Sequence, residues 1–254
     1  MTSTPTGQGQ GRRAEVVLVY QSLLGIYGDR GNATVLAKRL AWRGFDAVLS
    51  LVEPGDPLPD TGDVYLLGGG EDAAQISAVN ALRADGGLHR AVDRGAAVLA
   101  VCAGYQIVGR SFTVADGPSA TAEGDTEIVG LGLLDVTTTR GPVRAVGEIL
   151  SRWTGRDGDE QWLTGFENHG GYTVLGPGAS PLATVEVGVG NCGDGTEGAV
   201  AGTVVGTYPH GPVLARNPAL ADHVLELALG EPMSALDRPE VTELRRQRLA
   251  AVRR

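Results

Sequence analysis

The feature that most constrains the fold is a set of short, uninterrupted apolar segments separated by helical or glycine-rich sequence. These apolar segments are residues 15–20, 47–52, 64–67 and 96–101. Continuous runs of Val, Leu and Ala of this length are typical of strands buried on both faces. Helical patterns lie between them, at residues 32–43, with Asn32 or Thr34 as the N-cap, and at residues 72–94. Strands that alternate with helices predict an α/β fold with a mainly parallel central sheet flanked by helices.

The second half of the chain has a different character, with many Val, Thr and Gly residues and shorter candidate strands. These candidates are residues 131–136, 165–167, 182–187 and 199–207. We expect them to add antiparallel strands to the same domain. The predicted organisation is therefore a disordered N-terminal tail (1–14), one domain (15–230) and a C-terminal helical extension (231–254). The domain's last helix is predicted at residues 218–229.

Composition excludes several classes of function. A formal net charge of -9 argues against nucleic-acid binding, which normally needs a basic face. No uncharged apolar run reaches the roughly 18 residues of a membrane-spanning helix. With only two cysteines, a disulfide framework is not expected, and a reducing cytoplasm is the natural location. We predict no metal site in this chain.

The chain's single lysine, Lys38, lies in a helical pattern and not after a glycine-rich loop. A P-loop needs a lysine directly after its glycines to reach the phosphates. We therefore predict that this chain does not bind ATP through a P-loop.

Cys102 is the strongest candidate for a catalytic residue. It ends the apolar segment 96–101 and is followed by two small residues and the start of a helix. Open α/β sheets place ligand chemistry at the carboxyl ends of strands, and a sharp strand-to-helix turn there exposes a nucleophile. The alternative is an inert buried cysteine, which position alone favours. Cys192 lies in a glycine-rich loop, and we assign it no role.

A cysteine nucleophile needs a base, usually a histidine, and the sequence contains four. His89 and His223 fall in helical patterns and are expected to be surface or packing residues. His210 follows the strand pattern at 199–207, and His169 lies in a polar loop after a short strand. From chemistry alone, His210 is only slightly favoured over His169.

At these motifs the chain resembles the class I, triad-type glutamine amidotransferases of the cobyric acid synthase-like branch, and within it the GatD-type glutaminase subunits of lipid II isoglutaminyl synthase. The resemblance covers most of the chain, from about residue 15 to residue 230. The matching segments are Leu67-Gly68-Gly69-Gly70 with Asp72 and Gln75, Val101-Cys102-Ala103-Gly104-Tyr105-Gln106, Gly165-Phe166-Glu167-Asn168-His169-Gly170-Gly171, Gly206-Thr207-Tyr208-Pro209-His210-Gly211-Pro212 and Asp29-Arg30-Gly31-Asn32.

The resemblance implies hydrolysis of L-glutamine to glutamate and ammonia through a thioester on Cys102, with His210 as acid and base. It places glutamine recognition on Arg144, with Arg140 as the fallback, and an ordinary solvated arginine is an equally good interpretation of Arg144. The glutamine site is also expected to include Gly69, Gly70, Ala103 and Gln106. The amides of Gly69 and Ala103 are expected to form the oxyanion hole.

The resemblance also implies a heterodimer in which a Mur-ligase-like synthetase subunit (MurT) receives the ammonia. That partner would use ATP and Mg to amidate the D-glutamate of the lipid II stem peptide in peptidoglycan synthesis, so no cofactor is expected in this chain. Two alternatives remain: a glutamine amidotransferase subunit for cobyrinate-type amidation, and a catalytically inactive interaction subunit with the same fold.

One departure from the wider family concerns the acid that orients the histidine. Most triad amidotransferases have a glutamate two residues after the histidine, where this chain has Pro212. GatD-type proteins share this lack. Glu167 is the candidate replacement, and a weakly oriented histidine would give low activity without the partner. The loop 29–32 is a candidate partner surface, with ordinary loop packing equally compatible.

Overall fold

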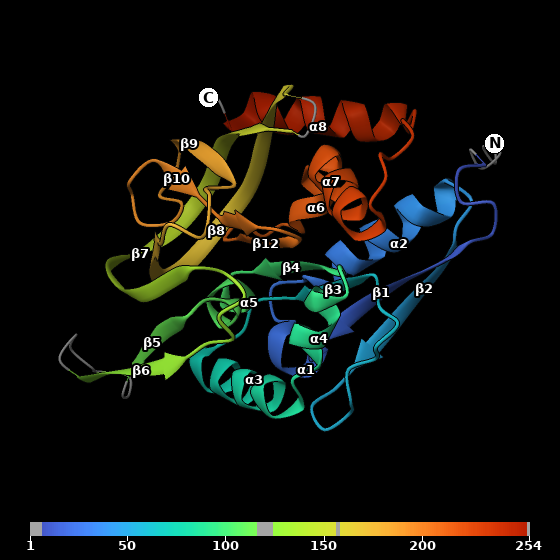
Figure 1. Ribbon diagram of the computed structural model, residues 1–254. Coiled ribbons are helices and arrows are strands. Elements are labelled where there is room, and N and C mark those ends of the chain that lie inside the picture. Colours follow the sequence, from blue (N-terminus) through green and yellow to red (C-terminus); the bar gives the residue numbers. More distant parts are fainter. Residues whose placement is uncertain (1–6, 116–123, 156–157, 253–254) are drawn as a thin grey trace.

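The computed structural model describes residues 7–115, 124–155 and 158–252 and contains a central sheet of six strands (Figure 1). The strands of this sheet are β1 (Arg13–Val19), β2 (Asp46–Val52), β3 (Val64–Leu67), β4 (Ala97–Val101), β11 (Ala199–Ala201) and β12 (Val204–Thr207). Their spatial order is β11-β12-β4-β3-β1-β2. All neighbours are parallel except the β11–β12 pair, which forms a short hairpin. The predicted α/β fold with a mainly parallel sheet is confirmed.

Helices cover both faces of this sheet, as the alternating pattern predicts (Figure 1). One face carries α2 (Arg30–Trp42), α6 (Val213–Arg216) and α7 (Pro218–Leu229), and the other carries α1 (Gln21–Leu24), α3 (Asp72–Asp85) and α4 (Gly87–Asp93). The residues of β3 and β4 are all buried, because helices exclude water from both sides. The core therefore lies in the layers on either side of β1, β3, β4 and β12.

The second half of the chain builds a separate sheet beside the first. Its strands are β5 (Ser111–Ala115), β6 (Asp125–Val129), β7 (Val136–Thr154), β8 (Glu160–Leu175), β9 (Ala183–Val187) and β10 (Thr196–Glu197). Most pairs are antiparallel, and the order is β10-β9-β7-β5-β6 with β8 on the other edge of β7. Sequence patterns detect only fragments of this sheet, and the strand predicted at 131–136 begins only at Val136.

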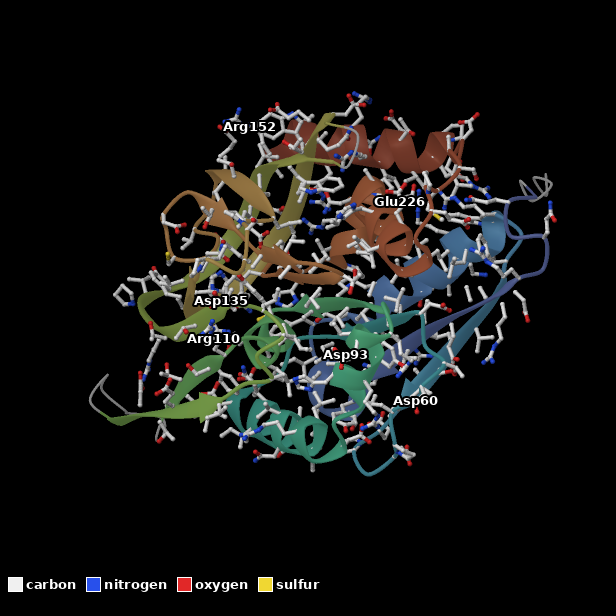
Figure 2. The ribbon with its side chains drawn as sticks, in the orientation of Figure 1. Asp60, Asp93, Arg110, Asp135, Arg152 and Glu226 are labelled. Atoms are coloured by element: carbon white, nitrogen blue, oxygen red, sulfur yellow. The ribbon has the colours of Figure 1, made fainter. Side chains whose placement is uncertain are left out.

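The long β7–β8 hairpin dominates this second sheet, and its register shifts between Arg140 and Ala145. Helix α5 (Ala103–Val108) joins the two sheets, since it follows β4 and leads into β5. Just after α5, Arg110 Nε lies 2.6 Å from Asp135 Oδ1, which precedes β7 (Figure 2). This ion pair ties the end of α5 to the start of the hairpin.

Both ends of the described chain pack against the body. Gln8 donates to the carbonyl of Pro232 and accepts from the amide of Ser234, and β1 begins at Arg13. The prediction of a disordered tail is therefore wrong for residues 7–14, while residues 1–6 lie outside the described part. Helix α8 (Pro239–Val252) lies across the far end of the β7–β8 hairpin (Figure 1). No helix within the described ranges is long and apolar enough to cross a membrane.

Candidate active site

Four loops converge where neighbouring strands of the central sheet end. Cys102 follows β4, His210 follows β12, and Gly69 follows β3. Asp29 lies in the segment after β1, between α1 and α2. Because these four strands lie side by side, residues far apart in the sequence meet at one edge of the sheet.

Cys102 lies on a strained turn between β4 and α5. Its backbone has φ 54° and ψ −107°, a conformation that non-glycine residues rarely adopt. The Cys102 amide donates to the Thr207 carbonyl at 2.9 Å, which anchors the turn to β12. The side chain is 7% exposed and lines a pocket. This is the geometry of a nucleophile elbow, in which the backbone turn and not the rotamer presents the reactive atom.

His210 lies between Cys102 and a buried carboxylate. Its Nδ1 faces Asp29 Oδ1 at 3.4 Å, and Cys102 interacts with the imidazole as well. Burial lowers the pKa of His210, but hydrogen bonds and charge interactions with Asp29 and Cys102 outweigh it and raise the pKa to about 9. Such a histidine is protonated at neutral pH and is positioned to stabilise a thiolate.

Asp29 is the functional residue that the sequence analysis misses. It is fully buried, and its Oδ2 accepts the Gly69 amide at 2.8 Å while Oδ1 faces His210. An acid that orients the histidine is therefore present, although Pro212 occupies the usual position. The sequence signals are its place between the first strand and the next long helix and its membership in the matching segment Asp29-Arg30-Gly31-Asn32, neither of which assigns it a role.

The prediction that Glu167 is this acid is wrong. Its two oxygens accept the amides of Val189 and Gly190, at 2.8 and 3.0 Å. Its nearest imidazole is His169, at 3.7 Å, and not His210. In the loop 29–32, considered as a partner surface, Asp29 and Asn32 are fully buried, whereas Arg30 is exposed. Asn32 Oδ1 accepts the amide of Leu214 and does not cap α2.

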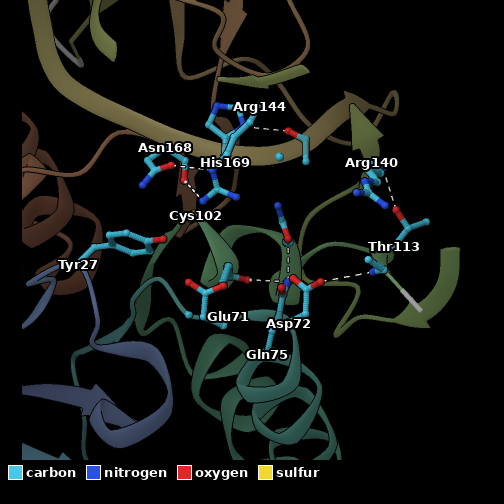
Figure 3. A pocket seen from close by; sticks show the side chains of 16 residues that line it. Tyr27, Glu71, Asp72, Gln75, Cys102, Thr113, Arg140, Arg144, Asn168 and His169 are labelled. Carbon is cyan, nitrogen blue, oxygen red and sulfur yellow. Dashed lines mark hydrogen bonds between the residues drawn. The ribbon is translucent and has the colours of Figure 1, made fainter. Parts of the chain in front are cut away.

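A pocket opens directly beside Cys102 (Figure 3). The predicted site residues that line it are Cys102, Gly70, Ala103, Gln106 and Arg144. His210 and Gly69 do not line it. His210 lies behind Tyr27, whose ring centroid is 4.5 Å from that of the imidazole and whose side chain forms part of the wall.

The two amides predicted for the oxyanion hole have different surroundings. Ala103 lines the pocket at the start of α5. The Gly69 amide donates to Asp29, so it is not available to a substrate oxygen, and this part of the prediction is wrong. Gly70, one residue further, faces the pocket instead.

Charged side chains of opposite sign stand on opposite sides of the pocket. Glu71 and Asp72 lie on one side, at the start of α3, and Arg140 and Arg144 lie on the other side, on β7 (Figure 3). Arg140 pairs with Asp125 at 3.3 Å. Arg144 has no carboxylate within ion-pair distance among the residues that the structure describes, so its charge remains available.

Gln106 forms a fixed part of the pocket wall. Its Oε1 accepts from Gln75 at 2.8 Å and its Nε2 donates to the Tyr208 hydroxyl at 3.3 Å. The amide group is thus held by neighbours on both sides, which gives this wall a defined shape.

Of the remaining three histidines, one lies at the pocket and two lie away from it. His169 lines the pocket, whereas His89 contacts the carbonyl of Leu131 and His223 packs edge-on against Trp153, both away from the pocket. Cys192 also lies outside it. In the described ranges, no group of three or more His, Cys, Asp or Glu side chains is arranged to hold a metal ion.

This fold and this cysteine–histidine–aspartate arrangement define a glutamine amidotransferase. Residues 15–218 match the model of the CobB/CobQ-like glutamine amidotransferase domain, and the chain belongs to that family. It is 34% identical over 208 residues to the lipid II isoglutaminyl synthase subunit GatD of Staphylococcus aureus, covering 81% of this chain and 80% of that one. The GatD subunit of Streptococcus pneumoniae is 32% identical, with 83% and 78% covered.

Other relatives share part of their length with this chain. The cobyric acid synthase of Sphingopyxis alaskensis is 37% identical over 70% of this chain but only 34% of its own length. Among solved structures, a glutamine amidotransferase superposes with a TM-score of 0.52 at 21% identity, covering 84% of this chain and 98% of that one. PurLQS from Thermotoga maritima gives 0.54 at 16% identity, covering 86% and 98%. At these identities the two structures support the fold alone.

Proposed function

We propose that this chain is the glutaminase subunit of a lipid II isoglutaminyl synthase. The observation that carries the proposal is Cys102 on its strained turn, beside a histidine held by a buried aspartate, in a chain similar to two GatD subunits over about four-fifths of their length. The geometry supplies a nucleophile, a base and an orienting acid for acyl transfer.

In the proposed reaction, the Cys102 thiolate attacks the side-chain amide carbon of L-glutamine. The protonated His210 gives its proton to the amide nitrogen, the C–N bond breaks, and ammonia leaves a thioester on sulfur. The neutral His210 then takes a proton from water, whose oxygen attacks the thioester. Glutamate leaves, and the thiolate and imidazolium are restored.

The oxyanion of each tetrahedral intermediate needs two donors close to the sulfur. We assign these to the backbone amides of Ala103 and Gly70, which both belong to residues lining the pocket. Gly70 replaces Gly69 in this role because Asp29 already accepts the Gly69 amide.

The opposed charges in the pocket suit a zwitterionic amino acid. Arg144 is proposed to bind the α-carboxylate through its guanidinium fork, and Glu71 to bind the α-ammonium from the opposite wall. Gln106, held by Gln75 and Tyr208, would shape the pocket around the side chain of the substrate.

The released ammonia is proposed to pass to a Mur-ligase-like synthetase subunit, MurT-like, that amidates the D-glutamate of lipid II with ATP and Mg. This chain would then contribute no cofactor and would work as half of a cytoplasmic heterodimer. A glutaminase role in cobyrinate-type amidation is the second candidate, because the cobyric acid synthase of Sphingopyxis alaskensis is 37% identical over the region that it shares with this chain.

The direct test is glutamate release from L-glutamine by the purified chain, alone and with its synthetase partner. We expect release that Cys102→Ala abolishes and that Cys192→Ala leaves unchanged, since Cys192 is outside the pocket. Glutamine-dependent amidation of lipid II by the pair separates the two pathways. No release with the partner present would contradict the proposal and favour an inactive interaction subunit.

A further inference from the structure

One side chain of the pocket wall has a contact pattern that the reaction alone does not explain. Asn168 Oδ1 accepts from Arg144 Nε at 2.8 Å, and the Asn168 carbonyl accepts from Arg144 Nη2 at 3.5 Å (Figure 3). Both residues line the pocket. Asn168 is therefore a neutral, two-point acceptor for a guanidinium that has no carboxylate partner among the described residues.

The position of Asn168 on β8 is fixed from both sides. The two residues that flank it, Glu167 and His169, are each 2% exposed and point into the interior. Glu167 accepts the Val189 and Gly190 amides, and His169 Nδ1 contacts the Gly171 carbonyl at 2.9 Å.

Two further contacts brace the same segment. The His169 ring is stacked on Tyr208, with centroids 3.7 Å apart and planes 13° apart. Phe166 exchanges two backbone hydrogen bonds with His210, at 2.9 and 3.1 Å. The strand that carries Asn168 is thus attached to the loop that carries the catalytic histidine.

We propose that Asn168 is a positioning residue that holds Arg144 in the orientation needed for the α-carboxylate of the substrate. This inference rests on the proposed glutaminase function. A free arginine side chain loses rotamer entropy when it binds a ligand, and holding it in place beforehand reduces that cost. A neutral acceptor does this without cancelling the positive charge, which a carboxylate at position 168 would do.

The test is a double-mutant cycle on L-glutamine binding, measured by titration calorimetry with the full chain in a Cys102→Ala background. Asn168→Ala is expected to raise Kd about tenfold, the usual effect of losing one charge-assisted hydrogen bond. In an Arg144→Ala background the same substitution is expected to change Kd less than twofold, because the group that it positions is gone. Asn168→Asp is expected to weaken binding more than Asn168→Ala, although it preserves the shape of the side chain.

Two controls separate positioning from general damage to the hairpin. Val146 pairs with Asn168 across the hairpin and is 61% exposed, and Val146→Ala is expected to leave Kd unchanged. With 4-aminobutanamide, which is glutamine without its α-carboxylate, Asn168→Ala is expected to have no effect on Kd.

Additive effects of the Asn168 and Arg144 substitutions would overturn the inference, as would equal losses with 4-aminobutanamide or no binding of L-glutamine at all. Hydrolysis by the chain with Cys102 intact, measured separately with the partner present, reports on the proposed function. Binding with the expected coupling but without hydrolysis would contradict the proposed function and leave the positioning role of Asn168 supported.

Discussion

His210 takes its properties from two groups that lie far from it in the sequence. Asp29 is separated from it by 181 positions, and Cys102 comes from a different strand. Each favours the protonated imidazole, which is why the pKa of His210 reaches about 9 in spite of burial. We therefore expect the imidazole of His210 to be protonated at neutral pH, where it can stabilise negative charge on the Cys102 sulfur.

The substitution Asp29→Asn tests whether the Asp29 carboxylate sets the charge and orientation of His210. Removing the Asp29 charge removes its charge interaction with His210 and weakens the hydrogen bond between them, while the interactions with Cys102 remain, so the pKa of His210 is expected to fall clearly below 9, observable by NMR. Glutamate release is expected to fall by roughly a hundredfold or more, because an asparagine no longer fixes the tautomer or the charge of the ring. An unchanged titration of His210 would show that Asp29 does not orient it.

The sequence predicts Cys102 but not Asp29, for a physical reason. The strand before Cys102, the small residues after it and the start of the helix are adjacent in the sequence, so a few consecutive residues are enough to predict the turn. Asp29 acquires its role only when β1 and β12 are placed in one sheet with β3 and β4 between them. Glu53 and Asp72 also follow strands, so a carboxylate in such a position does not by itself indicate the acid that orients the histidine.

Among the structural elements, those with strong local patterns agree best with the sequence analysis. Strand β3 and helix α7 have the predicted bounds, and β4 differs by one residue. The β7–β8 hairpin was predicted only as fragments, since its strands are half-exposed and carry Gly and polar residues. Its pairing is set by contacts between strands and not by periodicity within either one. Arg144 and Asn168 both lie in this hairpin, so their contact could not be predicted.

The fit of α5 against β3 gives a prediction at this scale. A Cβ added to Gly104 would lie 2.8 Å from both the Cβ and the carbonyl oxygen of Leu67, so Gly104→Ala forces α5 away from the strand. We expect a loss of about 1–3 kcal/mol in the free energy of unfolding. We also expect a marked fall in glutamate release, because Cys102 begins the same turn.

Gly147→Ala is the matched control for this substitution. Nothing lies within 4 Å of a Cβ at Gly147, so both stability and activity are expected to stay near wild type. Equal effects of the two substitutions in denaturant titrations would contradict the packing argument.

At the scale of the whole molecule, Arg245 links the C-terminal helix to the body by hydrogen bonds, beside a longer ion pair between Arg248 and Glu148 at 3.6 Å. Arg245 donates to the carbonyls of Trp162 and Arg216 and to the side chain of Asn217. Asn217 in turn bonds to the backbone of Thr164 in β8. The contact links α8, the start of α7 and the β7–β8 hairpin.

Arg245→Ala is expected to lower the thermal midpoint by several degrees, since three hydrogen bonds from a charged donor are lost. Arg246→Ala serves as the comparison, because Arg246 is exposed and pairs only with residue Glu243 of its own helix within the described structure. Its removal is expected to have almost no effect in differential scanning calorimetry. If both substitutions shifted the midpoint equally, α8 would not be held through Arg245.

The function of the molecule depends on whether the Cys102 sulfur accepts an acyl group from glutamine. The most direct measurement is mass spectrometry of the full chain, with its synthetase partner present, after treatment with the glutamine analogue 6-diazo-5-oxonorleucine. We predict one adduct per chain, located on Cys102, absent from Cys192 and suppressed by an excess of L-glutamine. An unmodified Cys102 under these conditions, or equal labelling of both cysteines, would contradict the account.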